Sequence, residues 1–244
     1  MQTVICMKWG TRYGPNYVNR LWRMVKRLSK RDTRLVCFTD NGDGIDPAVQ
    51  IEPIPHVNLP DHLKMLPWRK IALWNDELSY CLSGEVLFID LDVVLTGNLD
   101  DFFDYEPGKF CVIENFTQRG KNIGNTTLYR FSIGKHGYIF DQLNKSPEKF
   151  TNMYRVSQQY ISGEIDELTF WPREWCVSFK HDLLPRWPLN FFKMAALPKD
   201  AKLVAFTGKP DPDEAAIGKW PVRAAWKRLY KYTKPTPWIE ENWR

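Results

Sequence analysis

The sequence predicts one α/β domain whose sheet is parallel in its first half. Short apolar runs bounded by turn residues alternate with amphipathic segments from residue 3 to residue 114. A chain of 244 residues is long enough for one large core. No repeat, low-complexity tract or linker separates a second domain. Alternating strands and helices of this kind build a sheet with helices on its faces.

In the first half, the apolar runs predict strands at 3–7, 35–39, 49–54, 86–90 and 110–114. Apolar residues at helical spacing predict helices at 16–28 and 68–82. Each strand ends in a segment rich in turn residues, as at 40–44.

The pattern is less regular after Asn125. Apolar runs predict later strands at 127–133, 174–179 and 202–206, and helical spacing predicts helices at 136–143 and 147–162. Four Trp-Pro or Pro-Trp pairs interrupt this half. The sheet is therefore expected to be mixed rather than parallel throughout.

The amino-acid composition indicates the kind of ligand and the cellular compartment to expect. Eleven tryptophans favour a site for flat rings such as bases and sugars. Five widely spaced cysteines predict free thiols in a reducing compartment. The first residues lack the features of a signal peptide, and no run approaches the roughly 20 apolar residues of a membrane span. We expect a cytoplasmic protein.

The net charge of +5 is unevenly placed. Residues 20–31 and 223–232 are both basic and amphipathic, which suits either a solvated helix face or contact with an anionic membrane. We expect no nucleic-acid partner, because the total charge is modest and no long basic face carries interleaved aromatics.

The strongest chemical feature is a pair of carboxylates, Asp90 and Asp92, at the end of the apolar run 86–90. On a strand, residues i and i+2 share a face, so both would point into the crevice beyond the strand's carboxyl end. A hard divalent cation that also binds phosphate oxygens would relieve their repulsion. The alternative is that the pair caps the following loop or binds backbone amides.

Four segments together resemble nucleotide-sugar glycosyltransferases, nearest to glycosyltransferase family 8. They are residues 87–99 with the Asp-x-Asp motif, 68–71 (Trp-Arg-Lys-Ile), 206–210 (Phe-Thr-Gly-Lys-Pro) and 8–15. The resemblance covers most of the chain. It implies a GT-A-type single domain over residues 1–244, with a Rossmann-like mixed sheet flanked by helices.

The resemblance also implies site residues. Asp92 would be the principal metal ligand for Mn²⁺ or Mg²⁺, and Asp90 would contact the metal or the ribose. Gln158 falls at the catalytic position, where it would support the cationic sugar. The implied donor-binding residues are Thr11, Tyr13, Lys70, Asp90, Gly208 and Lys209.

The implied activity is metal-dependent transfer of a sugar from a UDP or GDP donor to a glycan or lipid-linked envelope acceptor, with retention of anomeric configuration. Negative charge grows on the leaving diphosphate, so cations must neutralise it. Residues 1–115 would form the nucleotide-sugar half, 116–222 the acceptor half, and 223–244 a basic aromatic tail. This tail is expected to contact the inner membrane face peripherally.

Three positions depart from the family pattern. Ala205 stands where the family has a metal-binding histidine, Asp211 where it has a lysine, and Ser157 where it has an aspartate. Three interpretations stay open: an active enzyme whose metal shell is completed by water or by Asp211, an enzyme for a distinct donor, or a protein that binds without turnover.

A further alternative is a phosphatase of the haloacid dehalogenase type. In that interpretation Asp90 would attack phosphorus and Asp92 would protonate the leaving group. That motif normally opens its fold, whereas several predicted elements precede it here, and the later pair Asp211 and Asp213 sits in a turn.

Overall fold

A computed structural model describes all 244 residues. Its centre is a seven-stranded sheet in the order β3-β2-β1-β4-β7-β6-β8. The strands span β1 Gln2–Lys8, β2 Thr33–Thr39, β3 Gln50–Pro53, β4 Glu85–Ile89, β6 Cys111–Glu114, β7 Gly124–Ser132 and β8 Thr169–Phe170.

The first four strands of this sheet are parallel, as predicted. β1 pairs with β2 on one side and with β4 on the other, so that Val4 lies opposite both Leu35 and Leu87. β7 runs antiparallel to β4 and to β6 and lies between them. The predicted mixed α/β sheet is therefore confirmed, and its direction changes beside β4.

A second sheet of three short strands joins distant parts of the chain. β10 (Leu203–Ala205) lies between β5 (Val93–Leu95) and β9 (Cys176–Ser178). The predicted strand 86–90 is one residue too long, because β4 ends at Ile89 and the chain bends before β5. The bend is needed because β4 and β5 belong to different sheets.

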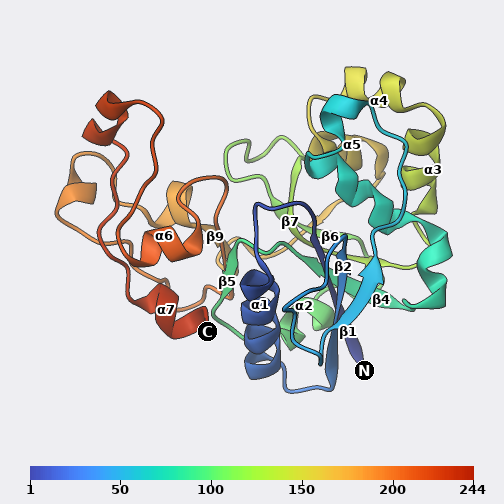
Figure 1. The fold of residues 1–244 in the computed structure, drawn as a ribbon, viewed down its shortest axis with the longest axis horizontal. Coiled ribbons are helices and arrows are strands. Elements are labelled where there is room, and N and C mark those ends of the chain that lie inside the picture. Colours follow the sequence, from blue (N-terminus) through green and yellow to red (C-terminus); the bar gives the residue numbers. More distant parts are fainter.

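Helices cover both faces of the large sheet (Figure 1). The α-helices span α1 Pro15–Leu28, α2 Asp100–Asp104, α3 Gly137–Lys145, α4 Pro147–Met153, α5 Ser157–Glu164, α6 Pro212–Ala216 and α7 Trp238–Asn242. Short 3₁₀ or π turns span η1 Asp61–Leu63, η2 Pro67–Trp74, η3 Asp76–Tyr80, η4 Phe179–Leu183, η5 Leu189–Phe191 and η6 Ala225–Leu229. None of these helices has both the length and the apolarity to cross a bilayer.

Two predicted helices are wrong in detail. Residues 68–82 form the 3₁₀ segments η2 and η3, which are separated by Asn75 in an extended conformation. The Asn75 side chain accepts a hydrogen bond from the Glu77 amide, which starts η3 afresh. Residues 147–162 are divided into α4 and α5, because Tyr154 is extended.

The two faces of the large sheet bury separate cores. Alternate residues of β1 show this directly: Val4 and Cys6 join the core under α1 and α7, whereas Ile5 and Met7 join the core under η2, α3 and α5. A parallel strand buried on both faces is apolar throughout, which explains why β1, β2 and β4 were predictable.

The C-terminal helix α7 belongs to the first of these cores. Ile239 and Trp243 are buried, and the Trp243 ring meets the Tyr17 ring edge-on at 5.0 Å. Arg20 of α1 donates a hydrogen bond to the Trp243 carbonyl at 2.8 Å. The end of the predicted tail 223–244 is therefore a docked part of the domain.

We predict that Ile239→Ala lowers the free energy of unfolding by about 2–4 kcal/mol, because it opens a cavity in a packed core. Denaturant unfolding of the purified protein measures the change. The neighbouring exposed Glu240→Ala is the matched control and should change it by less than about 0.5 kcal/mol. Equal stability of the two variants would mean that α7 is not docked in solution.

Candidate active site

The carboxyl ends of the parallel strands place the predicted site residues together. β1 is flanked by β2 on one side and by β4 on the other, so the chain changes direction along the sheet at this point. Open α/β sheets bind ligands in the crevice outside such a switch point. The loop 9–14 follows β1 and the bend 90–92 follows β4, and both adjoin this crevice.

Asp90 is paired with Lys70. The Lys70 ammonium lies 2.6 Å from the Asp90 carboxylate, and the Asp90 amide donates to the Thr127 carbonyl at 2.9 Å. Lys70 comes from η2, whose apolar residues pack on the sheet beside it. The Asp90 side chain keeps 18% of its surface exposed, so the carboxylate is recessed but reachable.

Asp92 is held by two other parts of the chain. The Tyr13 hydroxyl donates to its carboxylate at 3.0 Å, and the Phe206 amide donates to its backbone carbonyl at 3.1 Å. Tyr13 itself packs on Tyr17 of α1, with ring centres 4.7 Å apart. The loop after β1 and the residue that follows β10 therefore both fix Asp92.

Ionisation of the carboxylate pair is unfavourable. Burial and the nearby charge of Asp90 raise the pKa of Asp92 to about 7, although Lys70 and the Tyr13 hydroxyl oppose the shift. Burial also raises the pKa of Asp90, against the attraction of Lys70. One lysine does not compensate two recessed carboxylates, which is the situation that a bound divalent cation relieves.

The loop 207–211 lies beside this pair. Gly208 has a φ of +78° with open space where a Cβ would stand, as in loops that approach a ligand with their backbone. Lys209 contacts Asp211 at 2.6 Å and Glu214 at 2.7 Å. Asp211 and Glu214 form a capping box at the start of α6.

Arg12 is a site residue that the sequence analysis missed. Its guanidinium lies 3.4 Å from Asp211 and 4.9 Å from the centre of the Tyr13 ring. Partial burial disfavours its charge, but Tyr13, Asp211 and Asp92 outweigh this and raise the pKa of Arg12. The sequence offered one indication that Arg12 belongs to the site: it lies next to Tyr13 in the segment 8–15.

The donor set suits a divalent cation only in part. Asp90 and Asp92 offer the hard oxygen ligands that Mg²⁺ and Mn²⁺ accept, but no group of three or more His, Cys, Asp or Glu residues is arranged around a common point. Ala205 is fully buried in β10 opposite Val93 and supplies no ligand. Asp211 already binds Arg12 and Lys209. The remaining positions would fall to phosphate oxygens and water, which is the usual arrangement for Mg²⁺ with a nucleotide.

Gln158 and Thr11 lie on other elements than the carboxylate pair. Gln158 is in the first turn of α5, which packs through Tyr160 on Trp68 of η2, two residues before Lys70. No hydrogen bond joins the Gln158 side chain to the carboxylate pair. Thr11 is exposed in the loop after β1. Their roles stay predictions.

No protein-family model matches the sequence, and no curated protein matches it either. Solved glycosyltransferase structures do match. The galactosyltransferase LgtC in complex with donor and acceptor sugar analogues aligns with a TM-score of 0.60 at 12% identity, over 86% of this chain and 89% of LgtC.

Two further structures match at similar levels. The glycosyltransferase GlyE of Streptococcus pneumoniae TIGR4 has a TM-score of 0.58 at 10% identity, over 87% of this chain and 56% of GlyE. The bifunctional WbbM has a TM-score of 0.56 at 12% identity, over 86% of this chain and 46% of WbbM. This chain therefore has the fold of these glycosyltransferases, and the predicted GT-A-type fold is confirmed.

The raised pKa of Asp92 predicts a pH-dependent gain of stability in Asp92→Asn. The folded protein binds a proton on the Asp92 carboxyl more tightly than the unfolded chain does. As the pH rises from about 4 to about 7, Asp92 ionises and its contribution to the free energy of unfolding becomes increasingly unfavourable. We expect Asp92→Asn to raise the free energy of unfolding by about 1 kcal/mol at about pH 8 and by much less at about pH 4.5.

Thermal unfolding across this pH range measures the difference. Asp141→Asn, at an exposed position of α3, is the control and should leave the pH profile unchanged. A gain for Asp92→Asn that is the same at every pH would contradict a raised pKa at this carboxylate.

Proposed function

We propose that this protein is a metal-dependent glycosyltransferase that moves a sugar from a nucleoside diphosphate to a glycan acceptor. The observation that carries the proposal is the recessed Asp90–Asp92 pair at the switch point of a glycosyltransferase fold. Such a pair favours a divalent cation and, through it, a diphosphate.

Asp92 and Asp90 would hold Mn²⁺ or Mg²⁺, which neutralises the charge that grows on the leaving diphosphate. Because the chain offers only these two carboxylates, we expect the metal to bind together with the nucleotide and weakly without it. Lys70 holds Asp90 in place and opposes the burial that raises the pKa of this carboxyl.

Arg12 and Lys209 are the cations best placed to bind the diphosphate. Each contacts Asp211, which therefore holds the two positive charges beside the carboxylate pair. Arg12 offers a planar fork of donors suited to phosphate oxygens. The open backbone at Gly208 would let phosphate approach the loop closely.

The finer assignments follow the family resemblance. Tyr13 would contact the nucleotide base while its hydroxyl holds Asp92, Thr11 would line the donor, and Gln158 would support the cationic sugar in a retaining reaction. The donor would be of the UDP or GDP type, and residues 116–222 would supply the acceptor side. The proposed compartment is the cytoplasm.

A second candidate is a protein that binds the nucleotide sugar without transferring the sugar. Ala205 and Ser157, which replace a family histidine and aspartate, favour it. The phosphatase alternative is disfavoured, because its nucleophile Asp90 is tied to Lys70 and follows the fourth strand of the sheet.

Calorimetric titration of UDP and GDP, with and without Mn²⁺, tests the proposal. We expect one nucleotide to bind about tenfold or more tightly with Mn²⁺, and Asp92→Asn to remove that enhancement. Asp141→Asn should bind like the native protein. Binding of neither nucleotide would refute the proposal, whereas metal-dependent binding without any sugar transfer or donor hydrolysis would support the non-catalytic candidate.

Arg12→Gln and Lys209→Gln test the diphosphate contacts. Each should weaken UDP or GDP about tenfold, which matches the loss of one charge-assisted hydrogen bond, and should weaken the corresponding monophosphate less. Arg23→Gln on the exposed face of α1 is the matched control. An equal effect on diphosphate and monophosphate would contradict a role at the second phosphate.

A further inference from the structure

Two segments far apart in the sequence form one projecting unit, here named the apolar lobe: residues 186–194 and 225–232. The Trp187 indole donates to the Leu229 carbonyl at 3.0 Å, and the Asn190 amide donates to the Tyr232 carbonyl at 2.9 Å. The Phe191 ring stacks on the Tyr232 ring at 4.9 Å. These contacts make the lobe a built element rather than two loose loops.

The apolar lobe exposes large hydrophobic side chains to an unusual degree. Trp187 is 65% exposed, Phe192 73%, Trp226 62% and Leu229 72%. Seven of the sixteen large hydrophobic residues that the chain exposes lie on this lobe. A contiguous patch of this kind on a folded domain marks an interaction surface.

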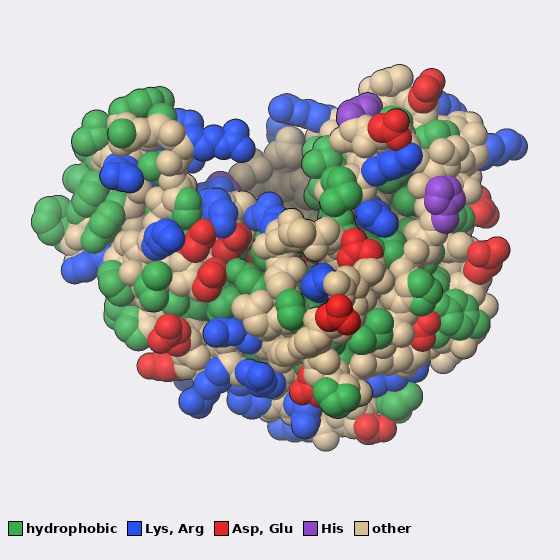
Figure 2. Space-filling view, in the orientation of Figure 1, with side chains coloured by type: hydrophobic (Ala, Val, Ile, Leu, Met, Phe, Trp, Pro, Cys, Tyr) green, Lys and Arg blue, Asp and Glu red, His purple; other side chains and the backbone are tan.

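The same two segments carry only positive charge. They contain five basic residues and no acidic one; the basic residues are Arg186, Lys193, Lys227, Arg228 and Lys231. Figure 2 shows hydrophobic side chains over the top and outer flank of the left-hand lobe, with Lys and Arg beside them. Exposed Trp and Tyr among basic residues suit the interface of an anionic bilayer.

The lobe rises on the side of the molecule where the crevice opens. In Figure 1, the red and orange segments of the lobe and the helices α4 and α5 rise beyond the sheet on the same side as the loop after β1. Figure 2 shows a hollow between these two raised parts. A surface bound by the lobe would therefore face the mouth of the crevice.

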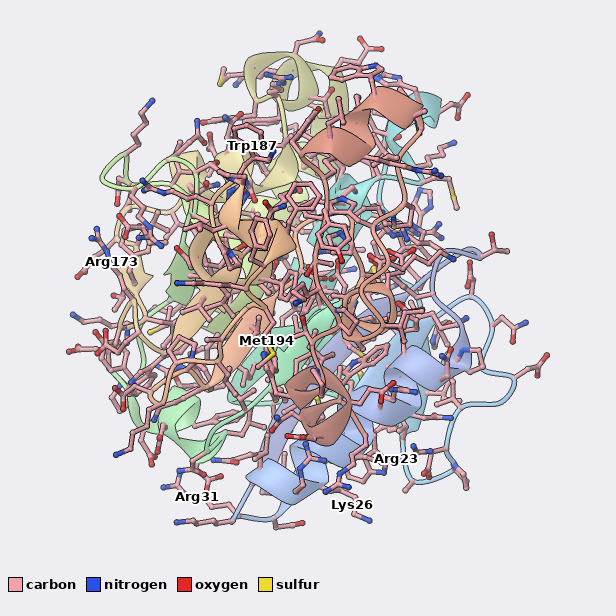
Figure 3. The ribbon with its side chains drawn as sticks, turned by 90° about the vertical axis from the view of Figure 1, so that its left-hand side faces the viewer. Arg23, Lys26, Arg31, Arg173, Trp187 and Met194 are labelled. Carbon is pink, nitrogen blue, oxygen red and sulfur yellow. The ribbon has the colours of Figure 1, made fainter.

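The other basic segment of the sequence, residues 20–31, does not share this surface. Figure 3 shows Trp187 near one end of the molecule and Arg23, Lys26 and Arg31 near the opposite end. Arg31 is also paired with Asp104, and Arg20 and Arg27 bind backbone carbonyls near the C-terminus. Its charges are thus partly used within the protein.

We propose that the apolar lobe docks on an anionic lipid bilayer, with its aromatic and aliphatic side chains in the interface and its basic residues on lipid phosphates. Resting on the proposed function, this places the acceptor in the membrane, where its sugar head group would meet the crevice. A second copy of the chain fits the lobe less well, because a two-fold contact would bring five positive charges against five.

Co-sedimentation of the full-length protein with vesicles tests the proposal. We expect binding to phosphatidylcholine vesicles that contain phosphatidylglycerol, and about tenfold weaker binding to phosphatidylcholine alone. Trp226→Ser with Leu229→Ser, and separately Lys227→Gln with Arg228→Gln, should each reduce binding about tenfold.

The controls carry matched changes elsewhere on the surface. Ile51→Ser removes a 45% exposed hydrophobic side chain from β3, and Arg23→Gln with Lys26→Gln removes two charges from α1. Both should bind vesicles like the native protein, and melting temperatures confirm that every variant folds.

Loss of binding in the α1 control but not in the lobe variants would overturn the proposal, as would no binding to anionic vesicles. Self-association that the lobe substitutions abolish, seen by sedimentation velocity without vesicles, would assign the lobe to a second copy instead. Calorimetry of UDP and GDP on the same variants separates this inference from the proposed function, because the lobe changes should leave nucleotide binding intact.

Discussion

The burial of two carboxylates, Asp90 and Asp92, side by side is the constraint around which this end of the sheet is arranged. Two carboxylates one residue apart lie recessed where β4 ends, and burial alone makes their charges unfavourable. The protein offsets this only in part, with Lys70 on one and the Tyr13 hydroxyl on the other. The negative charge that stays uncompensated at this solvent-accessible site favours the binding of a cation. The same charge lowers the stability of the folded protein, as is common at functional sites.

Two of the departures from the pattern that the sequence resembles, at Ala205 and Asp211, lie on either side of the loop 206–210. Ala205 takes the place of the histidine inside a paired strand, where it contributes packing and no ligand. Asp211 takes the place of the lysine, caps α6, and draws in Arg12 and Lys209. The positive charge of a lysine is absent at position 211, but the Asp211 carboxylate binds two other cations, Arg12 and Lys209. Arg12 and Lys209 therefore lie together beside Asp211, which is on the loop that follows β10.

Buried strands were predictable, and contacts between distant segments were not. β1, β2 and β4 are apolar on both faces, so their residues alone indicate central strands. β5 was missed because its three residues continue the apolar run of β4, and only pairing with β10 assigns them to another sheet. Asp90 and Asp92 could be predicted to share a site because they follow the apolar run of β4, whereas Lys70, inside η2, was indicated only by the family resemblance and its contact with Asp90 was not foreseen. Arg12 could not be predicted, because its partner Asp211 lies 199 residues away along the chain.

The C-terminal segment shows how one stretch of sequence acquires two physical roles. Trp226, Leu229 and Tyr230 are exposed, whereas Ile239 and Trp243, a few residues later, are buried against α1. Both parts contain tryptophan and aliphatic residues, but the first is basic without an acid, whereas the second carries Glu240 and Glu241. Asn190 joins the two segments of the apolar lobe to each other, and Trp238 of the docked helix α7 donates to the carbonyl of Ala195, which directly follows the first segment, so the lobe has a defined position relative to the sheet. A bilayer bound to the apolar lobe would have one orientation relative to the crevice. A loosely tethered tail would not fix that orientation.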